Sequence, residues 1–159
     1  MPRASDGRYE IIDEPLPGRF SQISVSPVFP LLCFMLGGAW LGWLWIAING
    51  YAFGSAHRRR ELWVALTSPL VALALFLGIA QLRVMELLSE AALEYALLLV
   101  VVWKLGSMYW LFNSQLRSFA LYQYFNGTVK NGAIVLVAAA LLGRRLLEPL
   151  HPVLRAVLQ

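Results

Sequence analysis

Long apolar runs separated by short polar stretches make up most of the chain. The runs occupy residues 28–54, 62–82, 91–113 and 128–147. Each reaches the length of about 20 residues that an α-helix needs to cross the hydrocarbon core of a bilayer. Their apolar residues are continuous rather than spaced along one helix face, which favours lipid over a soluble core. We therefore predict an all-α integral membrane bundle of four transmembrane helices.

The polar stretches between the runs predict how these helices are connected. Residues 57–61 and 83–90 are short connections, so consecutive helices should form antiparallel hairpins, with both ends of the bundle on one side. Residues 114–130, between the third and fourth runs, are amphipathic and rich in aromatic side chains, which is typical of the membrane interface. This extension either continues the third helix beyond the membrane or bends to lie along the interface.

The two ends of the chain lack such runs. Residues 1–27 are polar and interrupted by proline, which predicts an extended tail. Their mixture of acidic and basic residues does not fit a cleavable signal peptide, so the first apolar run should stay in the protein. Residues 148–159 predict a short interfacial C-terminal tail. Residues 28–147 then form one transmembrane domain.

Composition agrees with this class of protein. The 159 residues are 59% hydrophobic and 14% charged, whereas soluble domains average about 25% charged residues. The net charge of +4 comes from basic residues scattered over the flanks of the runs, so it indicates membrane contact rather than nucleic-acid binding. Lys and Arg close to the run ends are nearly equal in number on the two sides, which leaves the orientation open.

Glycines in the first run predict close helix packing. Gly38 with Gly42, and Gly50 with Gly54, form two G-x-x-x-G patterns. Such patterns let a neighbouring helix approach closely where no hydrophobic driving force acts between helices. The glycines fit packing inside the monomer, and they also fit the face of a homodimer.

Polar side chains inside the runs are candidates for function, because they are costly in a membrane. These intramembrane polar residues are Asn49, Thr67, Ser68, Glu94 and Lys104. Asn49 should form an interhelical hydrogen bond or cap a helix end. Glu94 lies one turn inside its run and is expected at the interface. Lys104 is too deep to reach the interface, so we predict that it meets carbonyls, Thr67 or Ser68, a carboxylate or water rather than lipid.

Arg58, Arg59 and Arg60 form a basic cluster between the first two runs. The cluster fits a topology-setting charge, a contact with lipid phosphate or a contact with an acidic partner. Motifs of known enzymes are missing: the sequence has no HExxH, no GxSxG, no glycine-rich phosphate loop and no acidic cluster with metal-ligand spacing. Cys33 is the only cysteine. We therefore expect no catalytic residue, no metal site and no cofactor.

One stretch carries a resemblance. Residues 26–60 contain Ser26-Pro27, then the double glycine Gly37-Gly38, then Asn49 and Gly54 before the basic cluster. With these features the stretch resembles the first hairpin of a loose group of uncharacterised small bacterial polytopic membrane proteins. The resemblance implies a multi-pass protein of the bacterial inner membrane and brings no activity with it.

The leading hypothesis is a non-catalytic protein that binds a partner protein, as an accessory subunit or as an immunity-type inhibitor of a membrane-acting toxin. Small size, the lack of catalytic motifs and the close-packing glycines favour it. The expected partners are the lipid bilayer and another membrane protein or a second copy of the chain, and no nucleic acid. The alternative is a small oligomeric channel or transporter with Lys104 lining the path, although the two halves show no convincing internal repeat.

Overall fold

The computed structural model describes residues 20–159, and the predicted all-α class is confirmed for this part of the chain. The described residues form six α-helices, two short 3-10 helices and no strand. In order, the elements are η1 (Ser21–Ile23), α1 (Val28–Gly37), α2 (Ala39–Ala52), α3 (Arg58–Val84), α4 (Glu90–Tyr124), α5 (Ala133–Leu142), η2 (Arg145–Leu147) and α6 (Pro152–Leu158). Residues 1–19 of the predicted polar tail lie outside the described residues.

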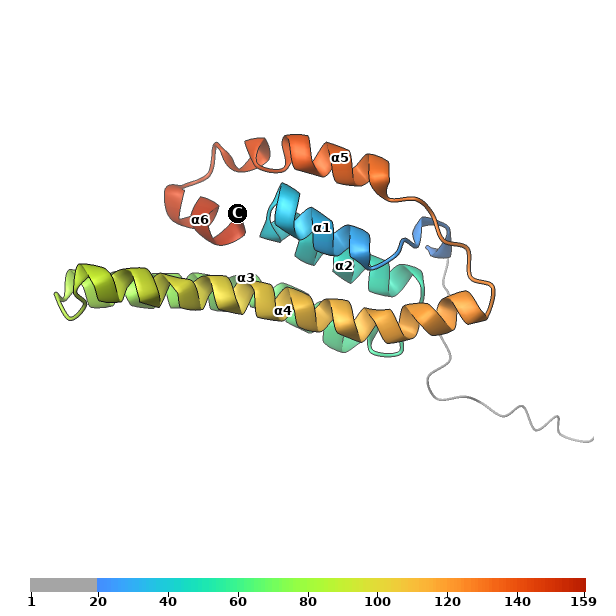
Figure 1. Cartoon of the computed structure of the whole chain (residues 1–159), viewed down its shortest axis with the longest axis horizontal. Helices are drawn as coiled ribbons and strands as arrows, with labels where there is room; N and C mark the ends of the chain where they lie inside the picture. The colour runs from blue at the N-terminus through green and yellow to red at the C-terminus, as the bar shows by residue number, and fades with distance from the viewer. Residues whose placement is uncertain (1–19) are drawn as a thin grey trace, which may run out of the picture.

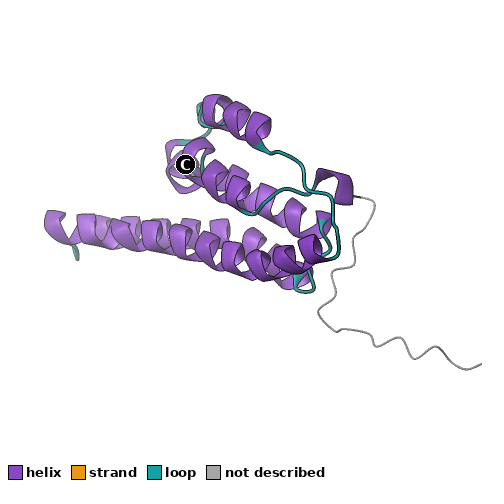
Figure 2. Ribbon diagram, turned by 45° about the vertical axis from the view of Figure 1, so that its right-hand side comes forward, coloured by secondary structure: helices purple, strands orange, loops and turns teal. Residues whose placement is uncertain are grey.

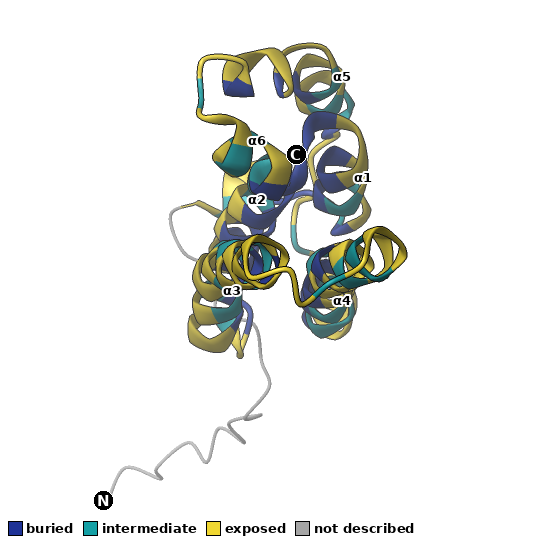
Figure 3. Ribbon diagram, turned by 90° about the vertical axis from the view of Figure 1, so that its left-hand side faces the viewer, coloured by how far each residue is buried: buried dark blue, intermediate teal, exposed yellow. Residues whose placement is uncertain are grey.

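The helices are stacked in layers over one long hairpin. Antiparallel α3 and α4 lie side by side, and α4 runs along almost the whole length of the molecule (Figure 1). A shorter hairpin of α1 and α2 packs on one half of this base, with α2 over α3 and α1 over α4 (Figure 3). Helix α5 covers α1, and α6 lies against α3 beyond the tip of the short hairpin.

Two helices, α3 and α4, are long and apolar enough to cross a membrane, with 27 and 35 residues. Only 22% of the most apolar 18-residue window of each is buried in the described part of the chain. The exposed remainder is what lipid contact requires, because a core helix of a soluble protein would be mostly buried. The other apolar helices are shorter: α1 and α5 have 10 residues each. The four membrane-crossing helices predicted from the sequence are therefore not shown, because only α3 and α4 among the described helices are long enough.

The predicted single helix over residues 28–54 is wrong. Gly38 interrupts it with φ of 111°, a conformation that L side chains rarely adopt, and the chain reverses direction between α1 and α2. The apolar run predicts burial in lipid, but it contains no polar residue that would mark the turn. Gly38, interpreted from the sequence as part of a packing motif with Gly42, is where the helix is interrupted.

Small residues let the short hairpin close and let α5 cover it. A Cβ added at Gly42 would lie 2.7 Å from Cα of Phe34, so α2 meets α1 backbone to backbone at this point. Phe34 and Trp43 then pack edge to face, with ring centroids 5.6 Å apart. On the other side of α1, a Cβ at Gly37 would lie 2.8 Å from the carbonyl oxygen of Ala139 in α5.

The path of α4 decides whether the amphipathic extension continues the third helix or bends away from it. One continuous helix runs from Glu90 to Tyr124, so the extension prolongs the third helix and does not bend away from it. A loop then leads to α5 (Figure 2). Within this loop, Lys130 N donates to Ser24 O at 2.8 Å, which ties the start of α5 to the start of α1.

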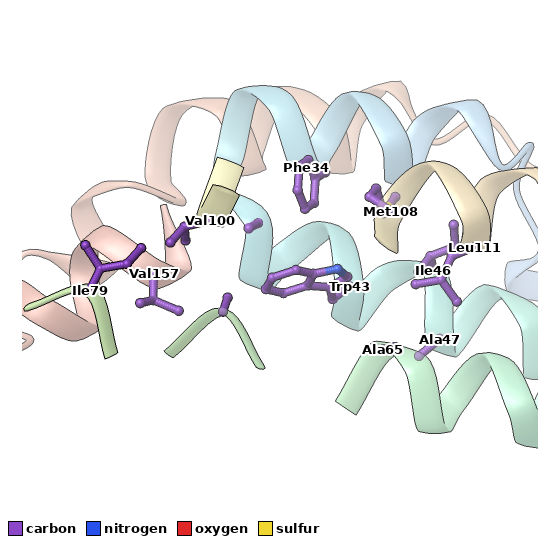
Figure 4. Packing of buried hydrophobic residues seen from close by; sticks show 12 residues of the cluster. Phe34, Trp43, Ile46, Ala47, Ala65, Ile79, Val100, Met108, Leu111 and Val157 are labelled. Carbon is purple, nitrogen blue, oxygen red and sulfur yellow. The ribbon is translucent and has the colours of Figure 1, made fainter. Parts of the chain in front are cut away.

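The core lies where the short hairpin and α6 meet the α3–α4 base. Its buried side chains come from five helices, and Figure 4 shows Phe34, Trp43, Ile46, Ala65, Ile79, Val100, Met108, Leu111 and Val157 among them. Val157 belongs to α6 and is 2% exposed. The predicted interfacial segment 148–159 therefore contains a helix that contributes to the core.

Substitution of Gly42 by alanine tests the close approach of α1 and α2. The added Cβ has no room beside Phe34, so we expect a lower unfolding temperature in detergent. Gly78→Ala in α3 is the matched control, because nothing lies within 4 Å of its added Cβ. It should leave the unfolding temperature unchanged or raise it, since alanine favours helix over glycine by about 1 kcal/mol. Equal behaviour of the two variants would rule out the tight contact.

Candidate functional site

The Glu61 side chain, in the first turn of α3, is the centre of a buried polar cluster. Only 1% of Glu61 is exposed. Its Oε1 accepts hydrogen bonds from Ser55 Oγ at 2.9 Å and from Ser114 Oγ at 2.7 Å, and its Oε2 accepts one from Gln115 Nε2 at 3.1 Å. No ion pair within residues 20–159 involves Glu61. Neutral donors from a loop and from α4 therefore satisfy the buried carboxylate.

Asn49 and Gln115 extend this cluster to α2 and to the segment before α1. Asn49 Oδ1 accepts from Val25 N at 2.9 Å, and Asn49 Nδ2 donates to Val25 O at 3.0 Å. The same Nδ2 lies 3.4 Å from Gln115 Oε1, so Asn49 makes the interhelical hydrogen bond predicted for it. Gln115 Nε2 also donates to Ile46 O at 2.6 Å. We call Asn49, Ser55, Glu61, Ser114, Gln115 and Ser118 the Glu61 network.

A polar pocket of about 410 Å³ opens beside the Glu61 network, between the start of α3 and the second half of α4. Ser114 and Ser118 belong to both. The pocket, which we call the basic pocket, is lined by Ala56, His57, Arg60, Trp110, Asn113, Ser114, Arg117, Ser118 and Leu121. Neither Arg60 nor Arg117 forms an ion pair within residues 20–159. The pocket therefore offers two guanidinium groups to an anionic group, whereas the hydroxyl hydrogens of Ser114 and Ser118 are used within the Glu61 network.

The arginine cluster predicted from the sequence is divided between two faces of α3. Successive helical residues point about 100° apart, so Arg58 and Arg60 face nearly opposite directions. The Arg58 guanidinium lies 5.9 Å from the ring centroid of Tyr51 in α2. That of Arg60 lies 4.9 Å from the ring centroid of Trp110 in α4. Arg59 is exposed between them and does not line the basic pocket.

The predicted intramembrane residues of α3 and α4 lie apart from the basic pocket. Lys104 is half-buried, and its Nζ donates to Ala156 O of α6 at 3.4 Å. Of the contacts predicted for Lys104, this is the one to a carbonyl. Thr67 and Ser68 instead donate to carbonyls of their own helix, at 2.8 and 2.6 Å. Glu94 is exposed one turn after the start of α4.

The four predicted packing glycines divide into turns and contacts. Gly38 and Gly54 have positive φ, 111° and 72°, and lie just before and just after α2. Gly42 contacts α1, as described above. A Cβ at Gly50 would lie 2.6 Å from both Gln115 Nε2 and Glu61 Oε2. Gly50 therefore leaves the space in which the Glu61 network is assembled.

The sequence interpretation missed Glu61 and its α4 partners, Ser114 and Gln115. Glu61 follows three arginines and looked like part of a solvated loop, and the other two looked like the start of an amphipathic extension. The predicted hairpin could have identified these residues from their positions along its two helices. Antiparallel helices joined at residues 85–89 bring the start of the second apolar run level with the end of the third. Polar residues in those two positions meet.

The chain matches no protein-family model, and the comparisons with curated proteins and with solved structures find no match. Residues 20–159 hold no group of three or more His, Cys, Asp or Glu side chains placed to bind a metal ion. The chemistry that the geometry does offer is recognition of an anion. Arg60 and Arg117 supply the charge, and the Glu61 network fixes Ser114 and Ser118 beside them.

Removal of the Glu61 carboxylate should destabilise the protein. Glu61→Ala leaves Ser55, Ser114 and Gln115 without their acceptor, and a buried unsatisfied polar group costs roughly 1–3 kcal/mol. We expect a clearly lower unfolding temperature in detergent, with Glu61→Gln intermediate because it keeps the volume and one acceptor. Glu94→Ala, at an exposed position, is the control and should change stability by less than about 0.5 kcal/mol. Similar losses for Glu61→Ala and Glu94→Ala would contradict the role given to the network.

Proposed function

We propose that the protein is a non-catalytic, multi-pass protein of the bacterial inner membrane that binds an acidic segment of a partner protein. One observation carries the proposal: Arg60 and Arg117 line the same pocket, and neither forms an ion pair within residues 20–159. Arginine pairs with carboxylates in a bidentate geometry, which gives both affinity and direction. Depending on that partner, the proposed role is that of an accessory subunit or of an immunity-type inhibitor of a membrane-acting toxin.

The surroundings of the pocket support binding by a preformed surface. Arg60 is held over the Trp110 ring, and Ser114 is held by Glu61 at 2.7 Å. Groups fixed before binding lose less conformational freedom when a ligand arrives. A volume of about 410 Å³ accepts one or a few side chains of a partner. Asn113, at the end of the apolar run, places the pocket near the level of the membrane interface.

The membrane arrangement is part of the proposal. Helices α3 and α4 cross the bilayer, and the hairpin of α1 and α2 enters it from the side where α3 begins and turns back at Gly38. The two hairpin helices are about 15 and 21 Å long, shorter than the hydrocarbon core of about 30 Å. This hairpin replaces the first of the four crossings predicted from the sequence. The assignment of the protein to the bacterial inner membrane depends on the resemblance of residues 26–60 to small bacterial membrane proteins.

Fewer observations support the alternative of a channel or transporter. Lys104, the residue on which it depends, donates to Ala156 O and does not line the basic pocket. A homodimer through the glycines of α2 is also less favoured, because Gly42 and Gly50 make their close contacts inside the chain.

Cysteine labelling tests the re-entrant hairpin. With Cys33 replaced, we expect Gln22→Cys and Ala56→Cys to react with an impermeant maleimide from the same side of the membrane. Leu87→Cys, in the turn between α3 and α4, should react only from the other side. If residues 28–54 crossed the bilayer, Gln22→Cys and Ala56→Cys would react from opposite sides.

Charge reversal tests partner binding. The tagged protein is purified from its own host in mild detergent, and co-eluting proteins are identified by mass spectrometry. We expect a partner in stoichiometric yield with the parent and its loss with Arg60→Glu or Arg117→Glu. An acidic residue of the partner changed to arginine should restore binding to the Arg60→Glu variant.

Arg59→Glu is the matched control, since it changes the same charge one residue away without lining the pocket. It should retain the partner. Recovery of the parent alone, or equal retention by all variants, would contradict the proposed function. Light scattering on the purified parent separates self-association from binding of a different protein.

A further inference from the structure

A second cavity, on the opposite face of the α3 start, differs from the basic pocket in chemistry. It is an open groove of about 550 Å³ between α2 and α3. We call it the apolar groove, and it is lined by Phe20, Ile23, Trp40, Trp43, Leu44, Ala47, Ile48, Tyr51, Leu62, Ala65, Leu66, Pro69 and Leu158. Every lining side chain is apolar or aromatic, so the body of the groove suits hydrocarbon.

A basic residue, Arg58, lies beside one end of the apolar groove without being one of its lining residues. Tyr51 lies at the end of α2, and the Arg58 guanidinium lies 5.9 Å from its ring centroid. Arg58 forms no ion pair within residues 20–159. One turn further along α3, Leu62 begins the apolar wall. The groove thus combines a cationic mouth with an apolar body, the complement of an anionic amphiphile.

The length of the groove corresponds to one leaflet. From Tyr51 to Trp40, α2 rises about 16 Å at about 1.5 Å per residue. Half of a hydrocarbon core of about 30 Å is about 15 Å. In the proposed membrane arrangement Arg58 lies at headgroup level, and the groove extends from there to the turn at Gly38.

We propose that the apolar groove holds one acyl chain of an anionic phospholipid whose phosphate contacts Arg58. The site is distinct from the basic pocket. It rests on the membrane arrangement proposed above and not on the identity of a protein partner.

Native mass spectrometry with phosphatidylglycerol and phosphatidylcholine as probes tests the site. The parent should retain one phosphatidylglycerol after delipidation and prefer it over phosphatidylcholine. Arg58→Gln should lower that preference about fivefold, the effect of about one basic residue at a membrane surface. Arg59→Gln, exposed next to Arg58, is the control for the general surface charge and should change the preference less.

Filling the groove gives the second arm. Leu66→Trp places a bulky ring in the groove, while Leu70→Trp is its control one turn along α3 outside the groove lining. Both positions are exposed, by 54% and 64%, so neither change should prevent folding. Leu66→Trp should weaken phosphatidylglycerol binding roughly tenfold or more, the equivalent of losing two buried methylene groups. Leu70→Trp should bind like the parent.

A phosphatidylglycerol with a diazirine on its acyl chain supplies a readout that does not depend on variants. Cross-links in the parent should map to α2 and the first half of α3. Equal lipid binding by Leu66→Trp and Leu70→Trp, cross-links elsewhere, or loss of a protein partner or of self-association with Leu66→Trp would each overturn the lipid site. Failure of the basic-pocket proposal would leave the lipid results unchanged, since Arg60 and Arg117 do not line the groove.

Discussion

The burial of the Glu61 carboxylate is the constraint on which the rest of the arrangement depends. Without a cation beside it, the group needs several hydrogen-bond donors, and a loop and α4 supply them. These bonds fix the register of α3 against α4. Gln115 then reaches Ile46 and Asn49, which seats α2 on the base, and Asn49 holds the segment before α1. One of these donors, Ser114, also lines the basic pocket, so the carboxylate fixes part of the pocket wall.

The sequence predicted the long hairpin well and the short one poorly. Arg83, Glu90 and the Ser89 cap interrupt the apolar pattern and mark where α3 ends and α4 begins. At Gly38 no such mark exists, because hydropathy reports the cost of transfer to lipid and not the direction of the chain. The contacts of the C-terminal segment could not be predicted either, since Val157 belongs to a core whose other side chains come from four separate helices.

The same division holds for the candidate site. Asn49 and the three arginines stand out in the sequence, Asn49 as a polar residue in an apolar run and the arginines as a cluster of charge. Their separation onto two faces follows from helical geometry, but the rings that receive Arg58 and Arg60 lie on other helices. Glu61 looked like a solvated flank residue, and only the tertiary register of α3 and α4 shows that it is buried.

The turn at Gly38 also determines at which end of the molecule α3 begins relative to residues 20–27. Because α1 and α2 return to the side where they start, residues 20–27 and the beginning of α3 share that side, as the bonds from Asn49 to Val25 and from Lys130 to Ser24 require. Arg58, Arg59, Arg60, Arg117 and Lys130 lie at the end where α3 begins, while Arg83 lies at the other end of α3 and Arg144 and Arg145 follow α5. A chain in which α1 and α2 merged into one straight helix would instead separate residues 20–27 from the beginning of α3 by the length of that helix, and Val25 could not pair with Asn49.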